Sequence, residues 1–136
     1  MILNSQINTI ANREFGRETA PPENYYVGLL LDTPKADGSN VIEVSPVGTA
    51  YVRMKLENNK NALSIAFNGK VSNTKSITFP VAAAPWGIIT DVGIFDAATG
   101  GNLLYVTTQG KPKDLDQGDI AFFNEGDIEF TVEAVN

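Results

Sequence analysis

Four carboxylates near the end of this sequence have the types and spacing that could bind a metal ion. Asp114, Asp116 and Asp119 lie close together, and Glu125 follows Asp114 by eleven residues. This separation matches the first and twelfth positions of a calcium-binding loop, which needs oxygen ligands. The match fails inside the loop, because Gly118 stands at a ligand position and Asp119 stands where the invariant glycine belongs. We therefore predict an ordinary acidic turn, with calcium binding as the alternative.

A second pair of carboxylates, Asp91 and Asp96, stands in and beside the longest apolar stretch. A buried carboxylate with a shifted pKa could act as a general acid or base. Strand alternation places Asp91 on the same face as Phe95 and Asp96 on the opposite face, so we do not expect the pair to cooperate. We expect Asp96 to accept hydrogen bonds from amides of the turn 97–101, and Asp91 to be satisfied by a backbone group or an arginine.

The sequence contains no histidine and no cysteine. Their absence excludes disulfides, thiol nucleophiles and serine–histidine catalysis, and it removes the commonest transition-metal ligand. Only carboxylates and lysines could act as catalysts. We predict no catalytic, cofactor-binding or metal-binding residues, and therefore no enzyme.

Two further features could mark binding sites. Gly93, inside an expected strand, indicates either a bulge or close approach by a large side chain such as Trp86 or a tyrosine. The tyrosines could line a carbohydrate groove, but we interpret them as packing residues: Tyr25, Tyr26, Tyr51 and Tyr105.

The formal net charge is −6, and the acidic excess lies mostly in residues 111–136. No cluster of lysine and arginine is present to displace the counterions of a nucleic acid, so we predict no nucleic-acid partner. The acidic end is interpreted as a solvated surface or, alternatively, as a patch for a basic partner. No stretch reaches the roughly 20 apolar residues of a membrane span, and the first residues do not resemble a signal peptide. We expect no membrane partner, and a chain that is made and used in the cytoplasm or assembled there into something larger.

The elements that would position these residues are predicted to be short strands. Trp86–Phe95 should form a central strand covered on both faces, with Asn102–Thr108 as its antiparallel neighbour across the turn Asp96–Gly101. Other predicted strands are Tyr25–Leu31, Val41–Val44 (a strand or an extended edge), Thr49–Leu56, Leu63–Asn68, Ser76–Phe79, Ile120–Phe123 and Ile128–Val135. The last two are expected to pair as a hairpin, and Gln109–Asp119 is expected to be a loop.

Several of these segments carry a prediction of which side chains are buried. Strict alternation in Thr49–Leu56 places Val52, Met54 and Leu56 on one face and Tyr51, Arg53 and Lys55 on the other, the face expected to be exposed. Leu63, Ile65 and Phe67 alternate with Ser64, Ala66 and Asn68, which predicts another half-buried strand. Before the strands, residues 2–15 show helical spacing of apolar side chains, ending at Gly16. The helix is expected to dock through this apolar stripe on its own domain or, alternatively, on a neighbouring subunit.

These elements predict an all-β fold: a two-sheet antiparallel β-sandwich or jelly-roll-like domain of eight to nine strands with one short N-terminal helix. Residues 1–136 are expected to form a single domain, with the helix in residues 1–16, a linker in residues 17–24 and the sandwich in residues 25–136.

The run ITFPVAAAPWGIITDVGIFDAATGGNLLY and the ending DQGDIAFFNEGDIEFTV resemble a family of small bacteriophage virion proteins usually labelled tail fibre proteins. The family's features match in order, and GIFDAATGGNLL is the most specific of them: Leu3–Phe15, Tyr26–Leu29, Asp37–Ser39, Ala50–Arg53, Ile77–Pro80, Trp86–Gly87, Gly93–Leu104, Gln117–Asp119 and Ile128–Val132. The sequence departs from the family at Asp114 and Asp116, where other members tend to be uncharged, and in the longer polar connection Lys70–Lys75.

The resemblance implies a non-enzymatic structural component of the virion, associated with the tail or tail fibre and mediating particle attachment or host-surface contact. A capsid decoration protein on the phage head is the alternative within this class, and a carbohydrate-binding domain is the alternative from another class. The partners implied are other virion proteins, a host cell-surface glycan and further copies of the chain in a homo-oligomer. No coiled-coil heptad fixes the number of copies.

Overall fold

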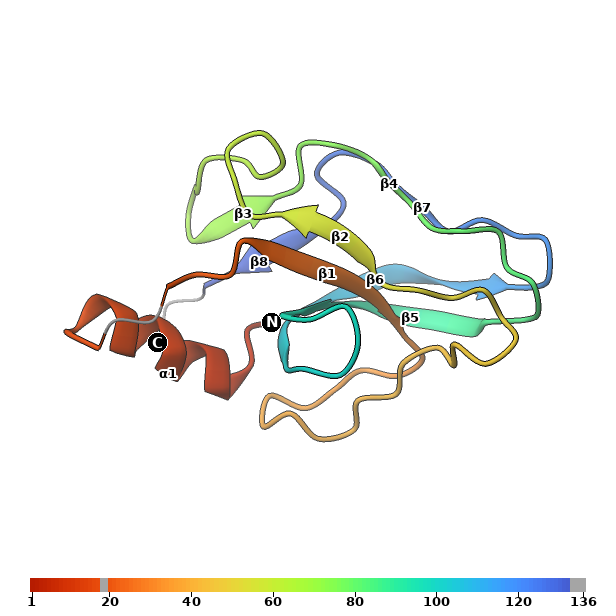
Figure 1. The fold of residues 1–136 in the computed structure, drawn as a ribbon, viewed down its shortest axis with the longest axis horizontal. Helices are drawn as coiled ribbons and strands as arrows, with labels where there is room; N and C mark the ends of the chain where they lie inside the picture. The colour runs from red at the N-terminus through yellow and green to blue at the C-terminus, as the bar shows by residue number, and fades with distance from the viewer. Residues whose placement is uncertain (18–19, 133–136) are drawn as a thin grey trace.

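The computed structural model describes residues 1–17 and 20–132. An antiparallel four-stranded sheet lies at its centre (Figure 1), in the order β2 (Met54–Glu57), β1 (Asn24–Leu30), β5 (Gly87–Phe95) and β6 (Leu103–Leu115). Two short antiparallel ladders supply a second layer: β3 (Lys70–Ser72) with β8 (Glu129–Thr131), and β4 (Ile77–Thr78) with β7 (Phe122–Phe123). With the helix α1 (Asn4–Glu14), these strands confirm the prediction of an all-β fold with one short N-terminal helix.

The β5–β6 hairpin contains the predicted central strand and its neighbour. Every β5 side chain from Asp91 to Phe95 is buried, as expected for a strand covered on both faces. The prediction that 109–119 is a loop is wrong, because β6 continues to Leu115 and Lys113 pairs with Ile89. The pairing of β6 with β5 is irregular at residues 109–112, between the partners of Asp91 and Ile89. The polar residues of this stretch are typical of a loop, but the segment is a strand because it pairs with β5.

The outer edge of β1 is shared by two segments. β2 pairs with the first half of β1, and Glu43 forms an isolated bridge with Leu30 in the second half. Residues 41–44 are thus the extended edge that the sequence predicted. The strand predicted at Thr49–Leu56 exists only from Met54, because Ala50 has a φ of 63° that interrupts the extended backbone. Val52 is 54% exposed and Tyr51 is buried, both opposite to the prediction.

The two ladders come from segments whose pairing the sequence did not reveal. β7 and β8 were predicted to form a hairpin with each other, but β7 pairs with β4 and β8 pairs with β3. The half-buried strand predicted at 63–68 is also wrong: residues 64–72 form a hairpin whose tip is Asn68-Gly69, and β3 is its second arm. Ile65 and Phe67, which the alternation placed on the buried face, are exposed. Both tip residues have positive φ, 51° and 73°, as a two-residue hairpin turn requires.

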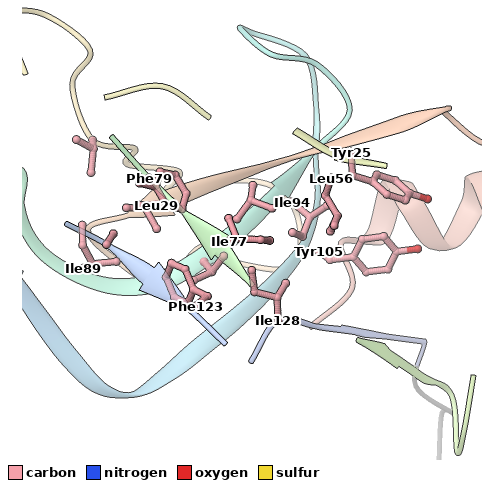
Figure 2. Close-up of a cluster of buried hydrophobic side chains, with 14 of the residues drawn as sticks. Tyr25, Leu29, Leu56, Ile77, Phe79, Ile89, Ile94, Tyr105, Phe123 and Ile128 are labelled. Atoms are coloured by element: carbon pink, nitrogen blue, oxygen red, sulfur yellow. The ribbon is translucent and has the colours of Figure 1, made fainter. Parts of the chain in front are cut away.

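The main hydrophobic core lies between the four-stranded sheet and the two ladders (Figure 2). Side chains from the sheet meet Ile77, Phe123 and Ile128 from the ladder side, and all three are at least 93% buried. A smaller cluster covers the opposite face of the sheet: Leu3, Leu30, Phe95, Leu103 and Val106. Both faces of the sheet are therefore buried, which explains the continuous apolar run of β5.

The helix α1 docks on its own domain, but through only part of the predicted apolar stripe: Leu3 is buried and Ile10 packs against the main core. Leu3 is buried and its amide donates to the Leu104 carbonyl at 3.0 Å, so residues 1–3 lie along the edge of β6. This orientation turns Gln6 inward, while Ile7 is 43% exposed and Phe15 is 82% exposed. No helix within residues 1–17 and 20–132 is long and apolar enough to span a membrane.

Candidate functional site

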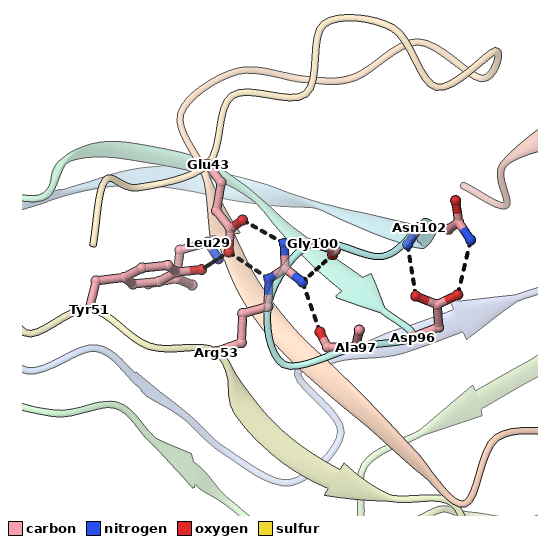
Figure 3. Close-up of polar contacts among 8 residues, drawn as sticks. All are labelled: Leu29, Glu43, Tyr51, Arg53, Asp96, Ala97, Gly100 and Asn102. Atoms are coloured by element: carbon pink, nitrogen blue, oxygen red, sulfur yellow. Dashed lines mark hydrogen bonds and ion pairs between the residues drawn. The ribbon is translucent and has the colours of Figure 1, made fainter. Parts of the chain in front are cut away.

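The turn between β5 and β6 is held by Asp96 (Figure 3). Its Oδ1 accepts a hydrogen bond from the Asn102 amide at 2.7 Å, and its Oδ2 accepts one from Asn102 Nδ2 at 3.1 Å. Asp96 therefore accepts a backbone amide as predicted, although the donor is the residue directly after the turn. Both Gly100 and Gly101 have positive φ, which lets the backbone close the loop without a Cβ clash.

Arg53 fixes the same turn from the neighbouring edge of the sheet (Figure 3). Its Nη1 donates to the carbonyls of Ala97 and Gly100, at 2.8 and 2.7 Å. Its Nε and Nη2 bind the carboxylate of Glu43 in a bidentate pair, at 2.9 and 2.8 Å. The Arg53 side chain is 8% exposed, so this pair is largely removed from water. The sequence predicted Arg53 to face solvent; it is instead the centre of a hydrogen-bond network.

Tyr51 extends this network to β1. Its hydroxyl donates to Glu43 Oε2 at 2.5 Å and accepts the Leu29 amide at 3.0 Å. Burial raises the pKa of Tyr51 far above its ordinary value, and the adjacent Glu43 carboxylate raises this pKa further. The phenol therefore stays protonated and acts as a fixed donor to Glu43.

Phe95 forms the floor of the network. The Arg53 guanidinium carbon lies 3.5 Å from the centre of the Phe95 ring, a cation–π contact. The ring occupies space left by two glycines that face each other in β1 and β5, Gly28 and Gly93. A Cβ on Gly93 would lie 2.9 Å from Leu103 and 3.1 Å from Phe95. The predicted close approach at Gly93 is confirmed, but the neighbours are neither Trp86 nor a tyrosine.

Asp91 is fully buried on the same face of the sheet and does not join the network. Its Oδ1 accepts hydrogen bonds from the hydroxyls of Thr33 and Thr90, both at 2.7 Å, and its Oδ2 accepts one from Thr108 at 2.8 Å. The expected backbone or arginine partner is replaced by three threonines. These bonds tie the loop after β1 to β5 and β6, so Asp91 has a structural role.

The acidic residues near the end of the chain lie in three separate places. Asp114 belongs to β6, whereas Asp119 Oδ2 accepts the Asp116 amide at 2.9 Å within a turn. Glu125 lies in the following turn 124–127. In the part of the chain that the structure describes, no three acidic residues are grouped closely enough to hold a metal ion.

Three of the four tyrosines are packing residues. Tyr25 and Tyr105 both pack against Phe130: their ring centres lie 5.3 and 5.2 Å from the centre of the Phe130 ring. Tyr51 packs against Trp86. All three tyrosines are buried. Tyr26 is half-buried beside the smaller core cluster. They do not form the exposed platform that a carbohydrate groove would need.

Three clefts surround the β5–β6 turn. A cleft of about 490 Å³ lies between α1 and the turn, and one of about 430 Å³ lies between the turn and the loop 37–43; both are lined by Ser5 and Asn102. The third, of about 310 Å³, is mostly apolar and is lined by Val44, Pro46, Tyr51, Val52, Ala98 and Thr99, with Glu43, Arg53 and Gly100 at its polar side. We call this third cleft the turn cavity.

One buried polar residue in the second layer was missed by the sequence analysis. Asn73 accepts the Ile128 amide at 3.0 Å and donates to the carbonyls of Lys75 and Asn124, at 2.8 and 3.0 Å. It holds the turn that separates β7 from β8. Its position in a polar connection gave no sign of burial, so only the three-dimensional contacts could reveal it.

The polar side chains described above secure loops and turns, and this arrangement is typical of a small β-domain that presents a rigid surface to other macromolecules. The model of the family described as Podophage GP4 fiber I protein gp80 matches residues 2–131. The chain belongs to this family of phage fibre proteins, whose members are structural components of the virus particle. No curated protein matches the chain. Family membership confirms the resemblance to tail fibre proteins as a class, while the GIFDAATGGNLL run as the family's signature stays a prediction.

Proposed function

We propose that this protein is a non-enzymatic module of a phage tail fibre, which binds other virion proteins through the surface around the β5–β6 turn. The observation that supports this role is the Arg53 network. It connects the turn to Glu43, Tyr51 and β1 through six hydrogen bonds with donor–acceptor distances of 3.0 Å or less. A turn fixed in this way loses little conformational freedom on binding, which favours affinity.

The proposed absence of catalysis is supported by the way the carboxylates are used. Asp91, Asp96 and Glu43 each accept hydrogen bonds from groups of the chain itself. Glu43 lines a cleft together with Asp37, but both of its oxygens already accept hydrogen bonds from Arg53 and Tyr51. This use of the carboxylate supports a role in presenting a surface.

The decisive experiment locates the chain in purified particles. Quantitative mass spectrometry and immunogold labelling should detect a few copies per particle at the tail. Absence from the particle would contradict the proposal, and hundreds of copies on the head would favour the capsid decoration role instead.

Host-surface contact is tested separately on a glycan array. Asn102 lines two of the clefts, so glycan binding that is lost in Asn102→Ala would support contact with the host surface. The single domain of residues 1–136 stays a prediction, which limited proteolysis can test.

A further inference from the structure

The hairpin 64–72 projects two large apolar side chains into solvent. Ile65 is 92% exposed and Phe67 is 77% exposed. Alternate residues of an extended arm share one face, so the two side chains form a single apolar knob. Burying one large apolar side chain contributes about 1.5–3 kcal/mol of favourable free energy. Leaving both Ile65 and Phe67 in water is therefore unfavourable unless something covers them.

The knob is rigid. Phe67 and Lys70 exchange two backbone hydrogen bonds of 3.0 Å across the tip, and the Ser64 amide donates to the Ser72 carbonyl at 2.9 Å. The Gly69 carbonyl accepts the Val132 amide at 2.8 Å, which ties the tip to the end of β8. The backbone that carries Phe67 is therefore held in place, which favours insertion of this side chain into a partner.

The turn cavity matches the knob in size and chemistry. Its volume is about 310 Å³ and its lining is mostly apolar. A cavity of about 150 Å³ is already large enough to hold a benzene ring. No residue of the hairpin lines the cavity. The hairpin leads into β3 in the upper part of Figure 1, whereas the β5–β6 turn lies in the lower part.

Charge also matches. The stretch that contains the knob, residues 58–75, carries three lysines and no acidic side chain: Lys60, Lys70 and Lys75. The charged side chains that line the cavity, Glu43 and Arg53, form an ion pair with each other. Asp37 lines the adjoining cleft, which shares both of these residues with the cavity. Asp37 therefore adds a negative charge beside the cavity that complements the lysines near the knob, which favours a second copy of this chain as the occupant.

We propose that Phe67 of one copy inserts into the turn cavity of a second copy. Because the two surfaces differ and lie apart on the chain, the contact is head-to-tail, and it produces a ring or a filament rather than a closed two-fold dimer. This inference deepens the proposed fibre role by naming a contact between copies. The two are separable, because a chain could be present in the particle and still be monomeric in solution.

Sedimentation velocity of the full chain over a concentration series tests the contact. The weight-average sedimentation coefficient of the wild type should rise with concentration, and the rise should shrink in about 1 M salt, where the screening length falls to about 3 Å. Phe67→Ala, which removes the knob, and Val52→Lys, which places a charge in the cavity, should each abolish the rise. Phe15→Ala and Val81→Lys, at residues that are 82% and 53% exposed outside both surfaces, are the matched controls and should keep it.

Mixing the two variants distinguishes head-to-tail contact from all others. Phe67→Ala retains an intact cavity and Val52→Lys retains an intact knob, so an equimolar mixture should form a heterodimer and grow no further. Circular dichroism confirms that each variant is folded. A wild type that stays monomeric, a Val52→Lys variant that still associates through knob-to-knob contact, or a mixture that stays monomeric would each overturn the proposal and leave another protein or a glycan as the occupant.

Discussion

Gly28 and Gly93 face each other across β1 and β5, and the Phe95 ring lies over the space that their missing side chains leave. The guanidinium of Arg53 covers the other face of this ring. The glycine pair thus sets how closely the network that holds the β5–β6 turn approaches the sheet. Neither glycine has a positive φ, so the backbone conformation does not require glycine at these positions. Glycine is required because the Phe95 ring lies too close to leave room for a Cβ.

Gly28→Ala should destabilise the protein. The added Cβ would lie 2.8 Å from Phe95 Cε2 and 3.0 Å from Tyr51 Oη, and the Phe95 ring cannot retreat because Arg53 lies against it. Overpacking of this kind costs about 1–3 kcal/mol in the free energy of unfolding, measurable by urea denaturation. Gly110→Ala in β6 is the control, because no atom lies within 4 Å of its added Cβ. Equal stabilities of the two variants would contradict this account.

Arg53→Lys should loosen the β5–β6 turn although it keeps the positive charge. A lysine cannot make the bidentate pair with Glu43 while also donating to the Ala97 and Gly100 carbonyls. A buried carbonyl left without its donor costs about 1–3 kcal/mol, and we expect a loss of this order in the free energy of unfolding. Hydrogen exchange should accelerate at the amides of residues 97–101, whereas Lys55→Arg on the exposed side of β2 should leave them unchanged.

The central hairpin was predictable from sequence because its signals are local. The apolar run of β5, the turn residues after Asp96 and the apolar start of β6 are all visible in the local sequence, and Asp96 was correctly predicted to accept a backbone amide. The same reasoning predicted α1 and the extended edge at residues 41–44, because periodicity and turn residues mark them directly.

Most of the errors come from pairing between segments far apart in the sequence, and the error at Arg53 comes from a local break in the strand. β8 pairs with β3 because Asn73 holds the turn before β8, and nothing in the local pattern around residue 73 indicates burial. Arg53 was assigned to the exposed face because it stands in an alternating pattern. The positive φ of Ala50 interrupts the strand before Arg53, so the pattern no longer predicts which way this side chain faces. The elements of the candidate site could be predicted, but the network that joins them could not.

Thr108→Val should destabilise the protein more than Thr33→Val. Asp91 Oδ2 accepts a hydrogen bond from Thr108, whereas Asp91 Oδ1 accepts two hydrogen bonds, one from Thr33 and one from Thr90. Removing Thr108 leaves a buried carboxylate oxygen without its hydrogen bond, which costs about 1–3 kcal/mol. Valine has the same shape as threonine, so packing is preserved in both variants. The order of the two midpoints in urea denaturation is the result to check, and the reverse order would show that Asp91 is satisfied in another way.

Ser39→Ala should change the titration of Asp37. Asp37 Oδ1 accepts hydrogen bonds from the Ser39 hydroxyl at 2.6 Å and the Ser39 amide at 2.9 Å. These bonds, with the hydroxyl contributing most, lower the pKa of Asp37 below its ordinary value of about 3.9. Carbon-detected NMR should show an Asp37 midpoint below this value in the wild type and closer to it in Ser39→Ala.

The sign of the linked stability follows from this direction. The folded protein binds fewer protons at Asp37 than the unfolded chain does, so the stabilisation is present above about pH 4 and is lost as pH falls through the lower folded-state pKa. The difference in unfolding free energy between wild type and Ser39→Ala should therefore shrink in acid. Asp32 is the internal control, because Asn40 and Thr33 lower its pKa and Ser39 does not contact it. A shift of both carboxylates together would mean that the whole loop had moved, and the prediction for Asp37 would be wrong.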